Sequence, residues 1–248
     1  MNPAEQFKQE CRNEIKAQGD NQQLQRLTRS WMDTANSGKY SYHFEWMGRP
    51  IIQYPQDILA MQQIIWEVKP DLIIETGIAH GGSLIFSASM LELIASCTGV
   101  EGEVLGVDID IRPHNRKAIE EHPMYKRISM IQGSSIAPDI IAKVKETAKG
   151  KERILVCLDS NHTYEHVLAE LEAYAPLTTV GSYCVVMDTV IEDMPDEMFP
   201  DRPWGKDNNP KTSVREYLKS NSDFEIDLAI QNKIMITVAP EGYLKRVR

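Results

Sequence analysis

The sequence has 248 residues, of which 27 are basic and 36 acidic, so its net charge is −9. A chain of this length can bury a substantial core in one large α/β domain with an extension. The acidic balance argues against non-specific binding to nucleic acid, because phosphates attract a basic surface. The basic residues at 245–248 are interpreted as a solvated tail.

No membrane partner and no oxidising compartment are indicated. Apolar runs stay well short of the ~20 residues that a membrane helix needs, and the polar N-terminus has no signal-peptide pattern. The four cysteines are widely spaced, and Cys157 and Cys184 lie in apolar runs where they are interpreted as core residues. We therefore expect a reduced, cytoplasmic protein.

Residues 1–48 are rich in Gln, Asn, Lys and Arg and carry a weak helical stripe that breaks near Gly19 and Asp20. We predict an N-terminal helical extension over 1–48 that packs on its own core or on another subunit. A homo-oligomer is the expected state. The aromatic stretch 40–46 could line a substrate pocket, although clustered aromatic rings more often pack against a core.

The next segment predicts a helix over 56–68, which Pro70 ends. The apolar run Leu72–Ile74 then predicts a strand buried on both faces, followed by a glycine-rich turn. A second helix is expected from Ser83, whose side chain suits the N-cap. In α/β sheets a strand, glycine turn and helix build a ligand site, because glycines let a ligand approach the backbone and the helix end offers free N–H groups.

The turn does not carry the dinucleotide fingerprint, because three residues separate Gly77 from Gly81 and its neighbouring glycine. A carboxylate at the end of the strand, Glu75, instead fits a methyl-donor site, where it can meet the cationic amino-acid end of S-adenosylmethionine. His80, inside the turn, could contact donor or substrate, or point to solvent. An ordinary turn without a ligand stays open, because fold alone does not imply function.

Further apolar runs predict strands at 104–109, 128–131, 153–159 and 182–188, with helices at 138–148 and 163–175. A long connection, 189–210, is interpreted as an ordered lid. A helix at 212–219 and an antiparallel hairpin of 224–230 with 234–238 are expected after it. The predicted fold class is α/β, a Rossmann-like seven-stranded sheet that is mostly parallel with one antiparallel strand.

Three of the predicted strands end in an acid, namely Asp108, Asp159 and Asp188. The carboxyl ends of neighbouring parallel strands converge on one crevice. Asp108, at the tip of the second strand, is placed to accept the ribose hydroxyls of an adenosine cofactor. Gly133, Ser134 and Ser135, after the third strand, are expected to flank its adenine ring, whose edge the small hydroxyl residues can hydrogen-bond.

Asp159 and Asp188 are predicted at the tips of neighbouring strands, where two carboxylates repel each other unless a cation or a proton lies between them. Mg²⁺ takes oxygen ligands and would stabilise both, and it could hold a substrate hydroxyl and lower its pKa. His162 is the candidate general base; alternatively it caps the following helix or is merely exposed. His166, one helical turn further, could be a second candidate, but it is interpreted as a surface or packing residue.

Five segments, in this order, resemble the cephalosporin hydroxylase / rhamnosyl O-methyltransferase family: residues 75–83, 107–110, 133–135, 158–166 and 242–246. The resemblance covers roughly residues 45–248. It implies the class I methyltransferase fold, with S-adenosylmethionine as the methyl donor. Relatives of this kind include Mg²⁺-dependent O-methyltransferases that act on sugars of natural products.

The resemblance also implies roles for individual residues. Cofactor contacts are expected from Glu75, Gly77, His80, Gly81, Ser83, Asp108, Gly133, Ser134 and Asp159. Asp159 would also supply a metal ligand and His162 the base. Metal-dependent relatives have a pair of acids after the fifth strand, whereas here Asp188 stands between Met187 and Thr189.

The predicted function is therefore an S-adenosylmethionine-dependent, Mg²⁺-assisted O-methyltransferase that acts on a hydroxyl of a small molecule, through a donor-binding domain over 49–248. The lost acid beside Asp188 favours an alternative, a non-catalytic accessory protein that binds the donor. A non-haem-iron hydroxylase would want two histidines and a carboxylate, and a second histidine at a strand end is missing.

Overall fold

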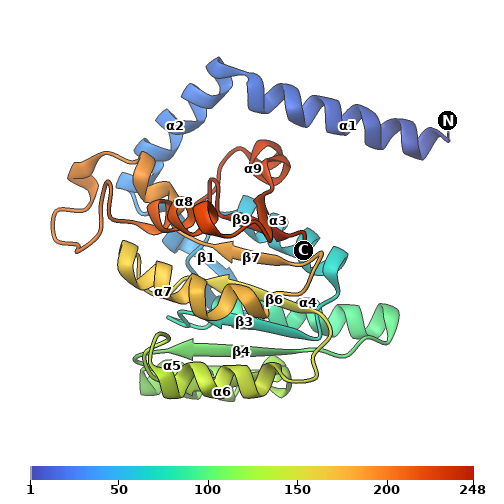
Figure 1. The fold of residues 1–248 in the computed structure, drawn as a ribbon, viewed down its shortest axis with the longest axis vertical. Helices are drawn as coiled ribbons and strands as arrows, with labels where there is room; N and C mark the ends of the chain where they lie inside the picture. Colours follow the sequence, from blue (N-terminus) through green and yellow to red (C-terminus); the bar gives the residue numbers. More distant parts are fainter. Residues whose placement is uncertain (1) are drawn as a thin grey trace.

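The computed structural model describes residues 2–248, apart from the side chain of Asp196. A seven-stranded sheet of order β5-β4-β3-β6-β7-β9-β8 forms its centre (Figure 1). Its strands are β3 (Leu72–Thr76), β4 (Glu103–Asp108), β5 (Ile128–Gln132), β6 (Ile154–Leu158), β7 (Tyr183–Val186), β8 (Phe224–Ile226) and β9 (Tyr243–Arg246). Strand β9 runs antiparallel to both of its neighbours, whereas β5, β4, β3, β6 and β7 are parallel. The predicted sheet with one reversed strand is confirmed.

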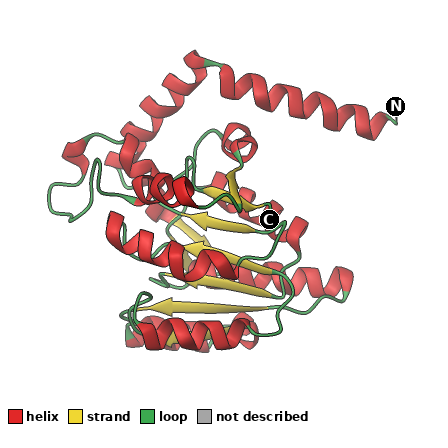
Figure 2. Cartoon of the chain, in the orientation of Figure 1, coloured by secondary structure: helices red, strands yellow, loops and turns green. Residues whose placement is uncertain are grey.

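Helices cover both faces of this sheet, and Figure 2 shows the strands as one layer between them. They are α3 (Pro55–Val68), α4 (Gly82–Thr98), α5 (Pro113–Glu120), α6 (Pro138–Ala148), α7 (Tyr164–Tyr174), α8 (Pro210–Ser220) and α9 (Leu228–Ile234). Apolar residues of α3, α4 and α5 share one core with the sheet, and those of α6, α7 and α8 share the other. Both cores are built because the strand residues alternate between the two faces. Within residues 2–248, no helix is both long enough and apolar enough to cross a bilayer.

The N-terminal segment is helical, as predicted. It contains α1 (Pro3–Asp20), α2 (Gln22–Ser37), a 3₁₀ turn η1 (Tyr40–His43) and a short hairpin of β1 (Phe44–Trp46) and β2 (Arg49–Ile51). The break falls at Asn21, whose side chain accepts a hydrogen bond from the N–H of Leu24 at 3.0 Å and so caps α2. Helix α1 extends away from the sheet (Figure 1). The domain boundary at residue 48 stays a prediction; it falls in the turn of the β1–β2 hairpin.

The predicted C-terminal hairpin of 224–230 with 234–238 is wrong, because only 224–226 forms a strand and 235–238 does not. Strand β8 ends at Ile226, and residues 228–234 form helix α9, which Asp227 caps by accepting from the N–H of Ala229 at 3.1 Å. The apolar residues there repeat every three to four positions, which is the period of a helix. The partner of β8 is β9, so the residues at 245 and 246 belong to a paired strand rather than a solvated tail.

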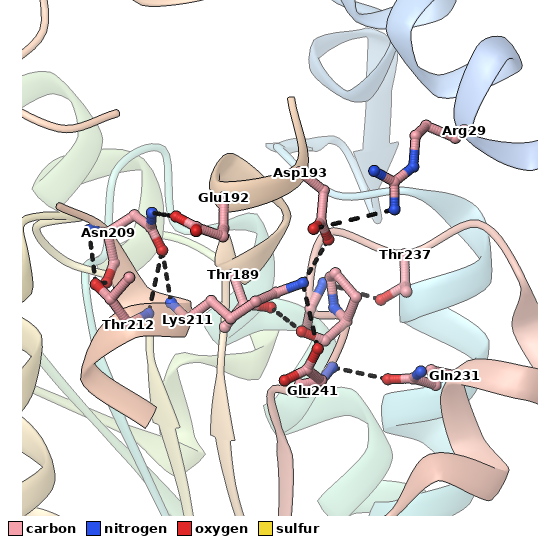
Figure 3. Close-up of polar contacts among 12 residues, drawn as sticks. Arg29, Thr189, Glu192, Asp193, Asn209, Lys211, Thr212, Gln231, Thr237 and Glu241 are labelled. Atoms are coloured by element: carbon pink, nitrogen blue, oxygen red, sulfur yellow. Dashed lines mark hydrogen bonds and ion pairs between the residues drawn. The ribbon is translucent and has the colours of Figure 1, made fainter. Parts of the chain in front are cut away.

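The connection between β7 and α8 is anchored at both ends. It begins with the 3₁₀ turn η4 (Thr189–Asp193) and includes a second one, η5 (Asp196–Met198). At its far end, the Asn209 side chain caps α8 by accepting from two backbone N–H groups. Figure 3 shows how Lys211, only 2% exposed, then reaches back to Asp193. The segment therefore has polar contacts at both ends, whereas its order and its action as a lid stay predictions.

Lys211 also lies 3.6 Å from Glu241, and Asp193 lies 4.0 Å from Arg29 of helix α2 (Figure 3). One buried ammonium therefore joins the connection, α8 and the turn before β9. We expect Lys211→Met to lower the free energy of unfolding by about 2 kcal/mol, less than the ~3–5 kcal/mol of a fully buried pair, because the two carboxylates keep some contact with water. Urea unfolding measures this.

The matched control is Arg215→Met, which removes a partner of the same Glu241 from a half-exposed position. An exposed pair contributes about 1 kcal/mol or less. Equal losses in the two variants would contradict the anchoring role of Lys211.

Candidate active site

The glycine turn after β3 lies against the tips of β4 and β6. Gly77 has φ of 90° and Gly81 has φ of 83°, a left-handed backbone that favours glycine. A Cβ on Gly77 would also collide with the backbone carbonyl of Asp159. Asp108 accepts hydrogen bonds from the N–H groups of Ile78 (2.8 Å) and Ala79 (3.2 Å). Gly77 and Asp108 therefore shape the turn itself, in addition to their predicted contacts with the donor.

Two residues that the sequence analysis missed hold the outer side of this turn. Arg49 donates from Nε to the carbonyl of His80 at 3.0 Å and from Nη2 to Asn115 at 3.1 Å. Asn115 in turn donates to the carbonyl of Ala79 at 2.9 Å. In the sequence these two residues are recognisable only as polar, because the residues that they contact lie far away along the chain.

The Ser83 prediction needs one correction. Helix α4 begins at Gly82, with Gly81 in the N-cap position, so Ser83 lies inside the first turn. Its hydroxyl donates to Glu75 instead. Glu75 is 3% exposed, and burial raises the pKa of its carboxyl to about 7, against the lowering effect of the Ser83 hydrogen bond.

This raised pKa predicts a pH-dependent stability. Folded Glu75 binds its proton more tightly than the unfolded chain does, so its contribution favours folding at low pH and is lost as the pH rises from about 4.5 to about 7. At 1.36 kcal/mol per pKa unit the loss is at most about 3 kcal/mol. We expect Glu75→Gln to reduce the slope in urea unfolding across that range, leaving the part that Asp57 and Asp159 contribute. The exposed control Glu225→Gln should keep it, and parallel wild-type and Glu75→Gln profiles would contradict the assignment.

Asp159, His162 and Asp188 meet at the tips of β6 and β7. One ligand atom from each lies within 4.8 Å of the other two, and Nε2 of His162 is 3.2 Å from a carboxylate oxygen of Asp188. The rings of His162 and of Trp204 in the connection pack edge to face, with 4.8 Å between ring centroids. Asp188 has a left-handed backbone with φ of 54°, which is uncommon for a residue other than glycine and is found at functional sites.

The donor set suits a divalent cation. Burial, followed by the charges of Asp188 and Glu75, raises the pKa of Asp159 well above its ordinary value. A cation between the two strand-tip carboxylates would relieve this repulsion. Met187 is buried and Thr189 donates its hydroxyl to the carbonyl of Pro240, so neither neighbour is available as a ligand. The cluster has one histidine, which does not match the two histidines of a non-haem-iron site.

Three adjoining cavities lie along this side of the sheet, and the cluster lines two of them. The first, of about 260 Å³, lies over the glycine turn and is lined by Gly77, His80, Gly81, Ser83, Asp159, His162 and Asp188 among others. A second of about 280 Å³ shares His162 and Asp188 with it and extends under the connection to Trp204. The third, of about 140 Å³, shares Gly77 with the first and is lined by Asp108 and Ser134. The reactive cluster thus lies where the first and second cavities join.

Two predicted cofactor residues lie outside these three cavities. Glu75 lies beneath the first cavity, in a small space that it shares with Ser83 and Asp159. Gly133 lines none of them; its N–H donates to the carbonyl of Asp108 at 2.8 Å, and a Cβ there would press on the side chain of Ile140. We infer that Gly133 is needed for packing against α6.

The aromatic residues of the stretch 40–46 have different roles. Tyr42, 55% exposed, lines both the first and the second cavity. Tyr40 and Phe44 instead pack edge to face with centroids 5.1 Å apart, and Trp46 packs on Phe86. The packing alternative therefore holds for Tyr40, Phe44 and Trp46, whereas a substrate contact of Tyr42 stays a prediction.

The family model described as "Rhamnosyl O-methyltransferase/CmcI" matches residues 38–247. The rhamnosyl O-methyltransferase of Mycobacterium leprae is 33% identical over 204 residues, covering 81% of this chain and 82% of its own length. The chain belongs to the rhamnosyl O-methyltransferase/CmcI family. Membership identifies it as an S-adenosylmethionine-dependent O-methyltransferase and confirms that prediction.

Solved structures of this family and of others share the fold. CmcI with Mg and SAM superposes with a TM-score of 0.57 at 19% identity, over 84% of this chain and 78% of that one. The O-methyltransferase TomG from Streptomyces achromogenes, in complex with SAM, gives 0.53 at 15% identity, over 89% and 90%. The predicted class I methyltransferase fold is confirmed.

The sequence analysis also missed Asp57, which holds a segment that lines the site of this O-methyltransferase. It is fully buried in the first turn of α3 and accepts from the N–H of Val238 at 2.9 Å and from the hydroxyl of Tyr243 at 2.7 Å. Val238 lines the first two cavities. Burial raises the pKa of Asp57 to about 6. An acid near a helix N-terminus is common, so its position alone gave no functional signal.

Proposed function

We propose that this enzyme transfers the methyl group of S-adenosylmethionine to a hydroxyl of a sugar-type acceptor, with His162 as the general base and with Asp159 and Asp188 as ligands of Mg²⁺. The observation that carries the proposal is the meeting of these three side chains where two cavities join. A base within reach of the acceptor oxygen on one side and a methyl donor on the other is the arrangement that such a transfer needs.

The first cavity would take the methionine end of the donor, beside the glycine turn and the helix α4 N-terminus, whose free N–H groups suit the donor's carboxylate. The third cavity would take its adenine ring, with Asp108 between them for the ribose. The sulfonium methyl would then face the second cavity. These placements rest on which residues line each cavity.

The second cavity would take the acceptor. His162 and Asp188 form its inner end, and Tyr42 and Trp204 contribute aromatic surface. Aromatic faces combined with polar groups suit a sugar ring, which has apolar C–H faces and a polar edge. The named relatives act on rhamnosyl groups, and this is the acceptor class that we propose here.

The chain's own residues would act in three ways. Asp159 and Asp188 would hold the cation, which when bound lowers the pKa of an acceptor hydroxyl and orients it. His162 would take the hydroxyl proton as the oxygen attacks the methyl carbon. Trp204 packs on the His162 ring and would limit the access of water to it.

Transfer of a labelled methyl group tests this function. With S-adenosylmethionine and Mg²⁺ present, we expect label on rhamnosides such as methyl α-rhamnoside or a nucleotide-linked rhamnose, as an O-methyl ether. Label on a catechol but on no sugar would overturn the acceptor class. Donor binding without transfer to any acceptor would support the accessory alternative, which family membership does not favour.

Several expectations about partners stay predictions. A homo-oligomer is expected because α1 has no buried residue within one chain and leaves Phe7 66% exposed. The cytoplasmic location and the lack of nucleic-acid and membrane partners are likewise expectations from the sequence.

A further inference from the structure

A buried polar network lies at the base of the third cavity, around His166. This residue was interpreted from the sequence as a surface or packing residue, yet it lines the cavity. Its Nε2 atom lies 3.0 Å from the hydroxyl oxygen of Ser135, 3.2 Å from that of Ser160 and 3.5 Å from a carboxylate oxygen of Glu170. Glu170 is fully buried.

We assign the tautomer of His166 from the three oxygens that surround its Nε2 atom. A ring nitrogen that faces three oxygens, one of them from a carboxylate, is satisfied as an N–H donor, whereas a bare lone pair would repel them. The hydroxyl of Ser160 donates to Glu170 at 2.7 Å, so the Ser160 proton is not available to His166. The N–H of His166 then donates to the oxygens of Ser135 and Ser160.

This leaves the hydroxyl proton of Ser135 without an acceptor among the side chains that the structure describes. The hydroxyl of Tyr174 donates to the backbone carbonyl of Ser135 and fixes that residue in place. A serine–histidine–acid relay is not formed, because Ser135 and Glu170 approach the same ring nitrogen, whereas a relay uses both nitrogens. The free proton is therefore available to a ligand in the cavity.

The cavity around this proton has the character of a subsite for one flat ring. Its volume of about 140 Å³ is below the roughly 300–1,000 Å³ of pockets that enclose a whole ligand. Val107 and Ile109 add apolar surface, and Asp108 lies at the side where a ribose would follow. Of the donor's parts, the adenine ring fits this description, and its unprotonated ring nitrogens accept hydrogen bonds.

We propose that Glu170 and His166 are positioning residues that aim the hydroxyl proton of Ser135 at a ring nitrogen of the donor's adenine. The inference rests on the donor's place in the third cavity. Ser135 would then contribute to selectivity for the adenine ring, and Glu170 and His166 would act through it. Because Ser160 belongs to the same network, the turn that carries Asp159 and His162 is held by the same two residues.

Calorimetry with S-adenosylhomocysteine and its 1-deaza, 3-deaza and 7-deaza analogues tests this proposal. In the wild type, one analogue should bind about tenfold more weakly, because it lacks the nitrogen that accepts from Ser135. Ser135→Ala should bind the parent ligand about tenfold more weakly and lose the discrimination. Ser129→Ala, a serine on β5 outside the cavity, should keep it.

His166→Phe should abolish the discrimination as Ser135→Ala does, and His166→Gln, which keeps an N–H donor, should restore part of it. Equal weakening of all four ligands by His166→Phe would mean that the network only supports the fold, and would overturn the proposal. Unchanged discrimination in Ser135→Ala would overturn it as well. If the wild type binds none of the four ligands, the donor site itself is misplaced.

Discussion

Replacing His162 by Gln should lower kcat for methyl transfer by about 10²–10⁴-fold, the usual contribution of a general base. Gln retains a polar side chain of similar size but cannot take a proton from the acceptor hydroxyl. The ring of His162 lies 3.2 Å from Asp188 at the junction of two cavities, so its loss should affect the chemical step. Single-turnover kinetics with saturating donor and acceptor measure this step directly.

The affinity for S-adenosylhomocysteine should change little in His162→Gln, because Gln keeps a polar side chain of similar size where His162 lines the first cavity. His114→Gln, an exposed histidine on α5, is the matched control and should retain wild-type kcat. A kcat within about threefold of the wild type in His162→Gln would exclude His162 as the base, since general-base catalysis contributes ~10²-fold or more.

Replacing Asp159 by Asn should have two opposite effects. The amide cannot ligate a cation as the carboxylate does, and stabilisation by a metal is worth several kcal/mol, so turnover should fall by at least about 100-fold. The same change removes a carboxyl group whose pKa is raised by desolvation and then by the charges of Asp188 and Glu75. The metal-free variant should therefore unfold at a higher temperature than the metal-free wild type.

Asp139→Asn, on the exposed face of α6, provides the control and should alter neither property. A variant Asp159→Asn that is inactive and also less stable would indicate a structural role in place of a metal-binding one. Thermal unfolding with and without Mg²⁺ distinguishes the two, because only the wild type should gain stability from the ion.

The sheet and the position of the site could be predicted because local patterns determine them. Apolar runs ending in Asp108, Asp159 and Asp188 mark strand tips, and parallel strands bring such tips together at one edge. The glycine turn was recognisable for a similar reason, since Gly77 and Gly81 adopt backbone angles that other residues rarely accept.

The features that were not predicted depend on contacts between residues that are distant in sequence. Arg49 and Asn115 hold the glycine turn from two separate segments, and Asp57 reaches residues 180 or more positions away. Helix α9 was mistaken for part of a hairpin because a short apolar segment fits both the period of a helix and that of a strand. The role of His166 was missed because Glu170 reads as an ordinary helical acid until its burial is known.

The most direct test of the cation-dependent site is the methyl-transfer rate of the wild-type enzyme before and after a chelator removes divalent ions. The proposed roles of Asp159 and Asp188 predict a fall of at least about 100-fold, reversed when Mg²⁺ is restored in excess. A rate that the chelator leaves unchanged would contradict a metal at these strand tips and would leave His162 to act without one.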